Sequence, residues 1–269
     1  MKIGILYFSP TGTTVKVCVA IAKGMTKENP LLLNITQAKF RLKFKEESGT
    51  YLNGIDHLIV GAPVYAGKLP LPVIETLNTI KVKDKQCTCI AVYGNRDYGV
   101  ALRDLVKKMT NGGFSVVAAG AFIGQHSYYR IIRVAMGRPD ESDLKIARSF
   151  GSSIANHSVN LLPEQIPVQL DRFSRSREYS ALVPAFVAES CSNCRECVET
   201  CPMDIISPES GDYKNADLKT KCIGCMACVN ACEYGARIDK TSWIMKFMVK
   251  LILRKASVTR TEPLLIPNS

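Results

Sequence analysis

Short apolar segments alternate with longer amphipathic ones along the first 160 residues. Five stretches rich in strand-forming residues predict strands, and they are Lys2–Phe8, Leu31–Thr36, His57–Gly61, Cys87–Tyr93 and Phe114–Phe122. The segments between them are typical of helices, such as Val15–Met25, which follows the first strand. Strands that alternate with helices form parallel sheets with both faces covered. The pattern therefore predicts an α/β domain with a doubly wound, parallel, five-stranded sheet over residues 1–160.

The pattern changes after residue 160. Residues 161–183 contain prolines and a polar run, and we expect a linker. Residues 184–240 hold most of the cysteines and predict a second, smaller domain. Residues 241–269 form a basic tail in which Trp243–Leu253 predicts an amphipathic helix with a basic edge. This helix could lie on an anionic membrane surface, but a short apolar helix more often packs on its own protein, and we favour packing.

Composition excludes several classes of protein. The chain has 269 residues, 46% of them hydrophobic and 22% charged, which is typical of a globular protein rather than a disordered one. No apolar run is long enough to span a membrane, and the N-terminus lacks a cleavable signal pattern, so we expect a cytoplasmic protein. The net charge of +11 does not by itself choose a partner, and we expect no nucleic acid. Dinucleotide-binding, P-loop and nucleophile-elbow motifs are absent from the sequence.

A hydroxyl-rich loop joins the first predicted strand to the first predicted helix. It reads Ser9-Pro10-Thr11-Gly12-Thr13-Thr14. Backbone amides and hydroxyls that converge before a helix N-terminus form a site for a phosphate.

This loop and its place in the α/β pattern resemble the flavodoxins, over about residues 1–160. The resemblance implies FMN at the carboxyl ends of the strands, with Ser9, Thr11, Gly12, Thr13 and Thr14 at its phosphate. By position, two later loops resemble those that hold the isoalloxazine ring, and their candidate residues are Pro63, Val64, Tyr65, Ala66, Gly67, Gly94, Asn95, Arg96, Asp97 and Tyr98. Tyr65 and Tyr98 are expected to stack on the ring, and Gly67 to leave the peptide near N5 free to reorient.

Eight of the eleven cysteines lie between Cys191 and Cys232, in two copies of one pattern. The copies read Cys191-x2-Cys194-x2-Cys197-x3-Cys201 and Cys222-x2-Cys225-x2-Cys228-x3-Cys232, so each cysteine recurs 31 residues later. Zinc and disulfide frameworks are alternatives, but zinc usually takes cysteines in pairs from separate loops. Cys18, Cys87 and Cys89 have apolar neighbours and are expected to be buried packing residues.

The repeated pattern resembles bacterial two-cluster ferredoxins, over about residues 184–240, and implies a small α+β domain with two [4Fe-4S] clusters. In that family the fourth cysteine of each run binds the other cluster. The implied ligands are Cys191, Cys194, Cys197 and Cys232 for one cluster, and Cys222, Cys225, Cys228 and Cys201 for the other. Gly224 and Ala227 are expected to let backbone amides approach the cluster sulfurs. Glu233 departs from the family, in which proline often follows the last cysteine.

Together the two halves resemble flavodoxin–ferredoxin fusions of anaerobic microbes. The resemblance implies an electron-transfer protein that couples one- and two-electron steps between two clusters and FMN, with no catalytic side chain required. One alternative is a ferredoxin-dependent FMN reductase that acts on a bound organic acceptor such as a quinone. Another is a domain that has lost FMN and serves only for docking. Donor and acceptor proteins, a small-molecule electron acceptor and a homodimer stay open as partners.

The segment Gln125–Asp140 bears on these alternatives because it is long for a connection and rich in aromatic and arginine residues. It could cover the flavin, dock an acidic partner or be a solvated loop. His126, within it, is expected to form hydrogen bonds rather than to act as a catalyst.

Overall fold

A computed structural model of the protein describes residues 1–130, 132–154, 160–169, 182–240 and 242–267. Its main sheet contains six strands in the order β2-β1-β3-β4-β5-β8. They are β1 (Ile3–Tyr7), β2 (Leu31–Asn34), β3 (His57–Pro63), β4 (Lys85–Tyr93), β5 (Phe114–Ile123) and β8 (Leu264–Ile266). The five predicted strands are present and all pair in parallel. Their order is that of the flavodoxin-like doubly wound fold, whose strand order reverses beside β1.

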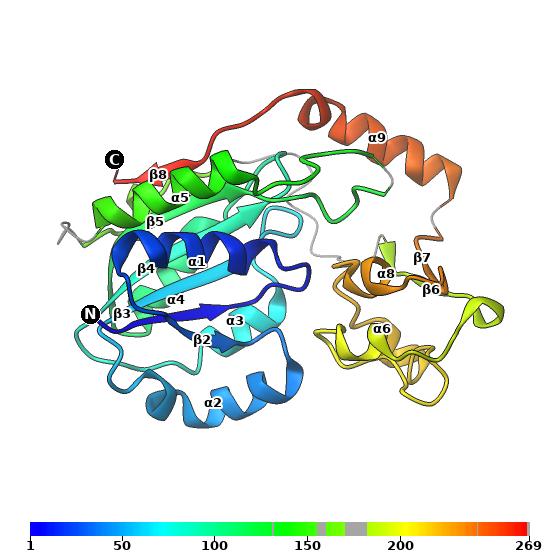
Figure 1. Cartoon of the computed structure of the whole chain (residues 1–269), viewed down its shortest axis with the longest axis horizontal. Helices are drawn as coiled ribbons and strands as arrows, with labels where there is room; N and C mark the ends of the chain where they lie inside the picture. Colours follow the sequence, from blue (N-terminus) through cyan, green and yellow to red (C-terminus); the bar gives the residue numbers. More distant parts are fainter. Residues whose placement is uncertain (131, 155–159, 170–181, 241, 268–269) are drawn as a thin grey trace.

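The sixth strand was not predicted. β8 pairs antiparallel with β5, from Ala119 opposite Ile266 to Ala121 opposite Leu264. It covers the edge that β5 would otherwise expose, and unpaired edges invite association with other chains. The predicted C-terminal tail therefore ends as part of the first domain (Figure 1).

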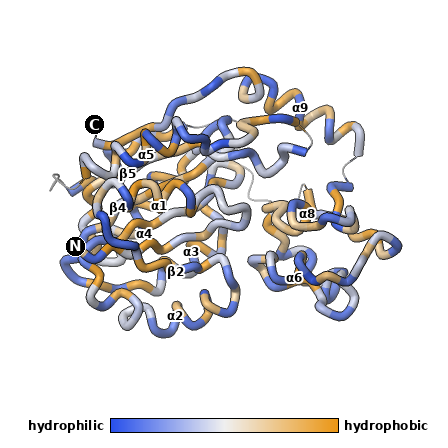
Figure 2. Tube along the Cα trace, in the orientation of Figure 1, coloured by the Kyte–Doolittle hydropathy of each residue, from blue (hydrophilic) through white to orange (hydrophobic). Residues whose placement is uncertain are grey.

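Helices cover both faces of the sheet, as the apolar strands require. The helices are α1 (Thr13–Met25), α2 (Ala38–Leu52), α3 (Leu71–Leu77), α4 (Ala101–Asn111) and α5 (Glu141–Ile154). Two hydrophobic cores lie on opposite sides: α1 and α5 contribute to one, whereas α2, α3 and α4 contribute to the other. Figure 2 shows the hydrophobic positions gathered in the strands and on the inner sides of these helices.

Two glycines allow α1 and α5 to pack closely. A Cβ atom at Gly24 would collide with the carbonyl oxygen of Arg148, and one at Gly151 would collide with that of Ile21. Any larger residue at either position would push the two helices apart.

The cysteine-rich domain is small and built from short elements. The linker before it contains one short 3-10 helix, η1 (Pro163–Gln165). The elements of the domain itself are β6 (Ala185–Phe186), η4 (Ala188–Ser190), α6 (Glu196–Glu199), α7 (Ala216–Lys219), α8 (Ala227–Ala231) and β7 (Arg237–Ile238). β6 and β7 pair antiparallel. The domain lies beside the carboxyl ends of the parallel strands (Figure 1).

Helix α9 (Trp243–Val258) leads from the cysteine-rich domain back to β8. It confirms the predicted helix and extends it by several residues. Val249, Leu253 and Ala256 are buried in a third hydrophobic core, together with Val134 of the segment after β5. Within the described part of the chain, no helix combines the length and apolarity that crossing a membrane requires.

Candidate functional site

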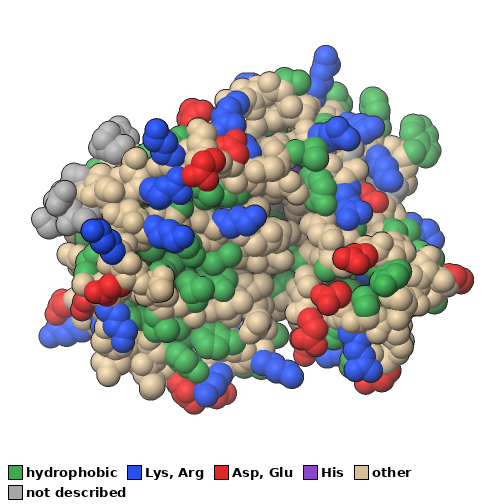
Figure 3. Space-filling view, viewed as in Figure 1, with side chains coloured by type: hydrophobic (Ala, Val, Ile, Leu, Met, Phe, Trp, Pro, Cys, Tyr) green, Lys and Arg blue, Asp and Glu red, His purple; other side chains and the backbone are tan. Residues whose placement is uncertain are grey.

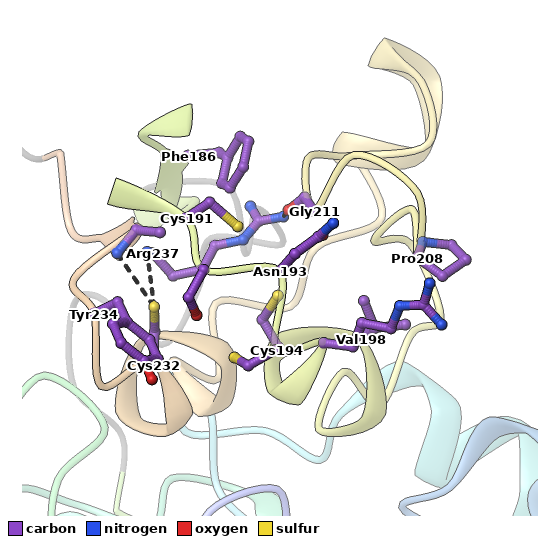
Figure 4. A pocket seen from close by; sticks show the side chains of 14 residues that line it. Phe186, Cys191, Asn193, Cys194, Val198, Pro208, Gly211, Cys232, Tyr234 and Arg237 are labelled. Atoms are coloured by element: carbon purple, nitrogen blue, oxygen red, sulfur yellow. Dashed lines mark hydrogen bonds between the residues drawn. The ribbon is translucent and has the colours of Figure 1, made fainter. Parts of the chain in front are cut away.

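The first four predicted cluster ligands line one cavity. Cys191, Cys194 and Cys197 come from the loop before α6 and from α6 itself, and Cys232 follows α8. The space inside this cavity, including the part that is continuous with solvent, is about 400 Å³. Figure 4 shows the sulfurs of Cys191, Cys194 and Cys232 directed toward this shared space. Cys194 is solvent-exposed, whereas Cys197 is buried.

The other four predicted ligands line a second cavity. It is lined by Cys201, Cys222, Cys225 and Cys228, with Tyr213 and Met226 among the other residues, and its space, including the part continuous with solvent, is about 340 Å³. Each cavity therefore takes three cysteines from one copy of the repeat and the fourth from the other copy, which is the crossed arrangement that the ferredoxin resemblance implies.

The backbone follows the sequence repeat. Asn193 and Arg195 adopt positive φ angles of 63° and 65°, and Gly224 and Met226, 31 residues later, have 62° and 59°. These left-handed residues alternate with the cysteines and curl each loop before a short helix begins. Only Gly224 adopts such angles without strain, so the other three are held by the surrounding loop.

Backbone amides point at several of the sulfurs. Cys232 Sγ accepts hydrogen bonds from the amides of Ala236 and Arg237, at 3.2 and 3.4 Å (Figure 4). Gly224 and Ala227 donate to Cys222 and Cys225, and this fits the role expected of these two small residues. Hydrogen bonds to cluster sulfurs are one means by which proteins set the potential of a cluster.

The donor chemistry fits iron–sulfur ligation. Among the described residues that line the two cavities, none carries a carboxylate or an imidazole. Burial raises the pKa of Cys222, and it raises that of Cys228 to about 12. A buried thiolate is therefore unfavourable without a cation, and metal coordination supplies one by displacing the proton. In the described residues, no group of three His, Cys, Asp or Glu side chains is placed to hold a single metal ion.

Arg237 is a feature of this site that sequence reasoning missed. The side chain is 1% exposed, lines the first cavity, and lies between the rings of Phe186 and Tyr213, at 5.1 and 4.8 Å from their centroids. Its Nη2 donates to the carbonyl of Gly211. Arg237 lowers the pKa of Cys197 through a side-chain hydrogen bond and through its charge, and its charge lowers the pKa of Cys228, against the larger effect of burial. The guanidinium is thus a buried cation beside both thiol sets.

The repeat contained a signal for this arginine. The position equivalent to Arg237 in the first copy is Ile206, which is buried in the core of the cysteine-rich domain. An arginine at the position where the first copy has a core isoleucine indicates that a positive charge has a role at this place in the second copy.

The predicted phosphate loop has the local geometry of an anion site. Gly12, with φ at 79°, precedes α1 and has no side chain that could cap the amides of the first helical turn. The Ser9 hydroxyl accepts from the amide of Val15, and the backbone amide of Ser9 donates to Thr36 Oγ1. Thr14 Oγ1 is buried without a hydrogen-bond partner. An unpartnered buried hydroxyl at this helix N-terminus is consistent with a phosphate ligand.

The loop from Pro63 to Gly67, predicted to hold the flavin ring, forms a tight turn against the second cysteine cavity. Ala66 and Gly67 both have positive φ, and Tyr65 and Lys68 exchange backbone hydrogen bonds across them. The carbonyl of Gly67 accepts from the amide of Val100. The carbonyl of Gly67 is thus engaged in this conformation, and reorientation of its peptide beside the flavin stays a prediction.

Tyr65 connects this turn to the cysteine-rich domain. Burial raises the pKa of its hydroxyl well above the usual value, and the next contributions come from Cys225 and Tyr128. Burial likewise raises the pKa of Tyr128 to about 12, with smaller contributions from Cys222 and Cys225. Two tyrosines thus stand between the second cavity and the carboxyl edge of the sheet.

The loop from Gly94 to Tyr98, also predicted to hold the flavin ring, differs more from expectation. Tyr98 is 4% exposed and packs edge-on against Tyr93, with ring centroids 5.7 Å apart, so its ring belongs to the hydrophobic core rather than to an open stacking surface. Asn95 is also buried. Its Nδ2 donates to the carbonyl of Ala256 at 2.8 Å and to that of Thr259, and its Oδ1 accepts from Thr261. The C-terminal segment is therefore fastened to a loop predicted to hold flavin.

The segment Gln125–Asp140 packs against the chain's own second domain. Tyr128, Val134 and Ala135 join the core that contains Met226 and Val229. Arg138 is buried, pairs with Asp143, and donates from Nη1 to the carbonyl of Thr261 at 3.0 Å. The described residues of this segment are therefore not a solvated loop, because they pack on the second domain of the same chain.

His126 and the isolated cysteines are structural, as expected. His126 Nδ1 accepts from the amide of Tyr128 at 3.1 Å, and burial lowers its pKa to about 4, with a smaller effect of Arg96. Cys18, Cys87 and Cys89 are fully buried.

Among comparisons with known proteins, a family model matches the second domain. Residues 190–237 match the family model described as a 4Fe-4S dicluster domain. This segment is therefore similar to iron–sulfur domains of the dicluster type. No curated protein matches the chain.

Solved structures resemble the first domain. A flavodoxin from the domain Archaea is 21% identical, with a TM-score of 0.41, over 58% of this chain and 96% of that one. Oxidised Flavodoxin 2 from Bacillus cereus is 17% identical, with a TM-score of 0.43, over 58% and 98%. The Streptococcus pneumonia TIGR4 flavodoxin is 16% identical, with a TM-score of 0.41, over the same shares.

Proposed function

We propose that this protein carries electrons between two [4Fe-4S] clusters and FMN. One cluster would be held by Cys191, Cys194, Cys197 and Cys232, and the other by Cys201, Cys222, Cys225 and Cys228. FMN would bind at the carboxyl edge of the sheet, with its phosphate at the loop from Ser9 to Thr14 and its ring near the turn at Tyr65.

The observation that carries this proposal is the packing of the second cavity on the first domain. Ile223 and Cys225 belong to the same hydrophobic core as Leu69 and Tyr98 of the first domain, with Tyr65 packed against it. Arg41, a buried residue of α2, donates to the carbonyls of Ile35 and Thr36 and also to that of Pro202, at 2.7 Å. Pro202 follows Cys201 directly, so the arginine joins a ligand loop to the edge of the sheet.

The two cavities differ in solvent exposure, and this difference indicates the path that electrons would take. Cys194 of the first cavity is open to solvent, where a redox partner can approach, whereas Cys225 of the second cavity is buried against the first domain. When bound, the clusters supply one-electron steps and FMN supplies one- or two-electron steps. The protein holds the thiolates, directs amides at the sulfurs and uses Tyr65 and Tyr128 to exclude water between the second cavity and the sheet.

The alternative of a reductase for an organic acceptor depends on a cover over the flavin, a role that Gln125–Asp140 could have filled. Tyr128, Val134 and Arg138 of this segment are instead engaged with the second domain, with Asp143 and with the C-terminal segment. We therefore favour the carrier, in anaerobic metabolism, over the reductase.

Anaerobic purification of the whole chain, with quantitation of iron, sulfide and flavin, tests both cofactor assignments. The proposal expects about eight iron atoms, about eight sulfides and one FMN per chain. About four iron atoms would contradict two clusters. Full iron without flavin, even after addition of FMN, would contradict the carrier and leave a docking domain.

A pair of variants tests the flavin site without relying on activity. Thr14→Val removes the buried hydroxyl while it keeps the shape of the side chain, and it should weaken FMN binding by about tenfold or more. Thr110→Val is the matched control, because Thr110 Oγ1 is also a buried hydroxyl without a partner but lies on α4. Fluorescence titration of the flavin would measure both, and equal effects would contradict the assigned phosphate site.

A further inference from the structure

Helix α9 has two apolar faces, and among the described residues one of them packs inside the molecule. Val249, Leu253 and Ala256 follow helical spacing and are buried against Val134 and the cysteine-rich domain. This face fixes the helix on the protein and therefore fixes the direction in which the opposite face points.

The opposite face is exposed to solvent. Trp243 is 78% exposed, Phe247 63% and Leu251 62%, and these residues recur at four-residue intervals along one stripe. Ile244, Met248 and Val258 widen the stripe and are also exposed. Large apolar side chains in a continuous exposed patch indicate an interaction surface rather than ordinary surface scatter. We call these six residues the outer face of α9.

Basic residues surround the outer face. Lys246, Lys250, Arg254 and Lys255 lie on α9, whose sequence contains no acidic residue. Lys246 approaches Asp239 at 4.0 Å, whereas Lys250, Arg254 and Lys255 are exposed. Figure 3 shows hydrophobic and basic side chains intermixed over the part of the surface where α9 runs. An apolar stripe flanked by lysine and arginine matches a surface that is apolar inside and negatively charged at its boundary.

We infer that the outer face of α9 binds the surface of an anionic lipid membrane. The helix would lie in the plane of the membrane, with Trp243 and Phe247 at the level of the headgroups and the lysine and arginine side chains extended toward lipid phosphates. A second copy of the chain is a poorer occupant, because apposed outer faces would bring like charges together. The inference does not depend on the proposed cofactors.

The single tryptophan of the chain provides a direct measurement, because Trp243 lies on the outer face. The purified holoprotein is mixed with vesicles of phosphatidylcholine and phosphatidylglycerol in equal parts, and with vesicles of phosphatidylcholine alone. We expect a shift of tryptophan emission to shorter wavelength and co-sedimentation with the anionic vesicles, with both weakened by high salt. Emission and sedimentation that stay unchanged with anionic vesicles would overturn the inference.

Variants separate the apolar and the charged contributions. The double change Phe247→Gln with Leu251→Gln should reduce partitioning by at least about tenfold, and Lys250→Glu with Arg254→Glu should abolish the preference for anionic lipid. Leu42→Gln is the matched control, because Leu42 is an equally exposed leucine on α2 and should leave binding unchanged. Light scattering of the same samples tests self-association, and a dimer that dissociates in the Phe247 and Leu251 variant without any lipid effect would also overturn the inference.

Discussion

The two cysteine cavities have the same loop backbone but different surroundings. The repeat places left-handed residues at equivalent positions in both loops, at Asn193 and at Gly224. The first cavity opens to solvent at Cys194, whereas the second lies against the first domain at Cys225. A repeated motif thus determines which cysteines come together, whereas the contacts around each copy determine whether its cavity faces solvent or the first domain.

The largest expected effect comes from removing one ligand from each cavity. Cys194→Ala and Cys225→Ala should each lose about four iron atoms per chain. After a reducing light flash, electrons redistribute between cluster and flavin, and absorbance follows this step. Its rate should fall by about a hundredfold in the Cys225 variant, because the cluster next to the flavin is lost. The Cys194 variant should keep a rate within about twofold of the original. Equal slowing in both would remove the functional difference between the cavities.

The charge on Arg237 is the next test of the comparison. Arg237→Met keeps much of the apolar volume but removes the cation, so the more negative reduced state loses stabilisation and the potential falls. We expect a decrease of about 60 mV, a tenfold change for one electron, in the first cluster, whose cavity Arg237 lines. Anaerobic titration followed by electron paramagnetic resonance measures it. Arg237→Lys should recover part of the potential, and an unchanged potential in the methionine variant would rule out this role of the charge.

A smaller effect is expected at the contact between the domains. Arg41→Met leaves the carbonyl of Pro202 without its donor, which should weaken the contact by about 2 kcal/mol. Hydrogen exchange should then increase at the second cavity while the first cavity stays unchanged. Lys39→Met, an exposed site on the same helix, is the control. A uniform increase over both cavities would indicate general destabilisation instead.

A dependence of stability on pH is expected at His126, which lies against Tyr128. Burial lowers the pKa of His126 to about 4, so between about pH 6.5 and pH 4 the unfolded chain binds a proton that the folded chain does not. Stability should therefore fall with decreasing pH in this window, by at most about 1.4 kcal/mol per pH unit for this group. His126→Asn should reduce the slope of the unfolding free energy against pH.

His57 supplies the control for this experiment. Burial also lowers its pKa to about 4, but it lies on β3, where it contacts Thr88 at 2.9 Å. The His126 variant should therefore retain the His57 part of the slope. A slope unaffected by the His126 change would mean that this histidine is protonated equally in both states.

Local patterns in the sequence were sufficient for much of the fold. Strands β1 to β5 were predicted within a few residues because each is an apolar run bounded by polar loops, and burial in a parallel sheet needs little more than that. The strand β8 was missed because three residues carry no periodic signal, and its place depends on pairing with β5, far away in the sequence.

The candidate site residues also divide into those that the sequence predicted and those that it did not. The cysteines could be grouped because their repeated spacing resembles that of two-cluster ferredoxins, in which the fourth cysteine of each run binds the other cluster. Asn95 could not be assigned correctly, because its partners Ala256 and Thr259 are remote in sequence. Tyr98 could not either, because whether a loop aromatic faces outward or packs against Tyr93 depends on the whole core.

The sequence by itself thus determined the two domains, their order and the two sets of four cysteines, since these depend on short-range periodicity and spacing. The tertiary structure alone decided that the second cavity faces the sheet, that Arg237 lies beside both thiol sets, and that α9 presents an apolar face to solvent. Each of these depends on contacts between segments far apart in the chain, and their free energies are not encoded in any local pattern.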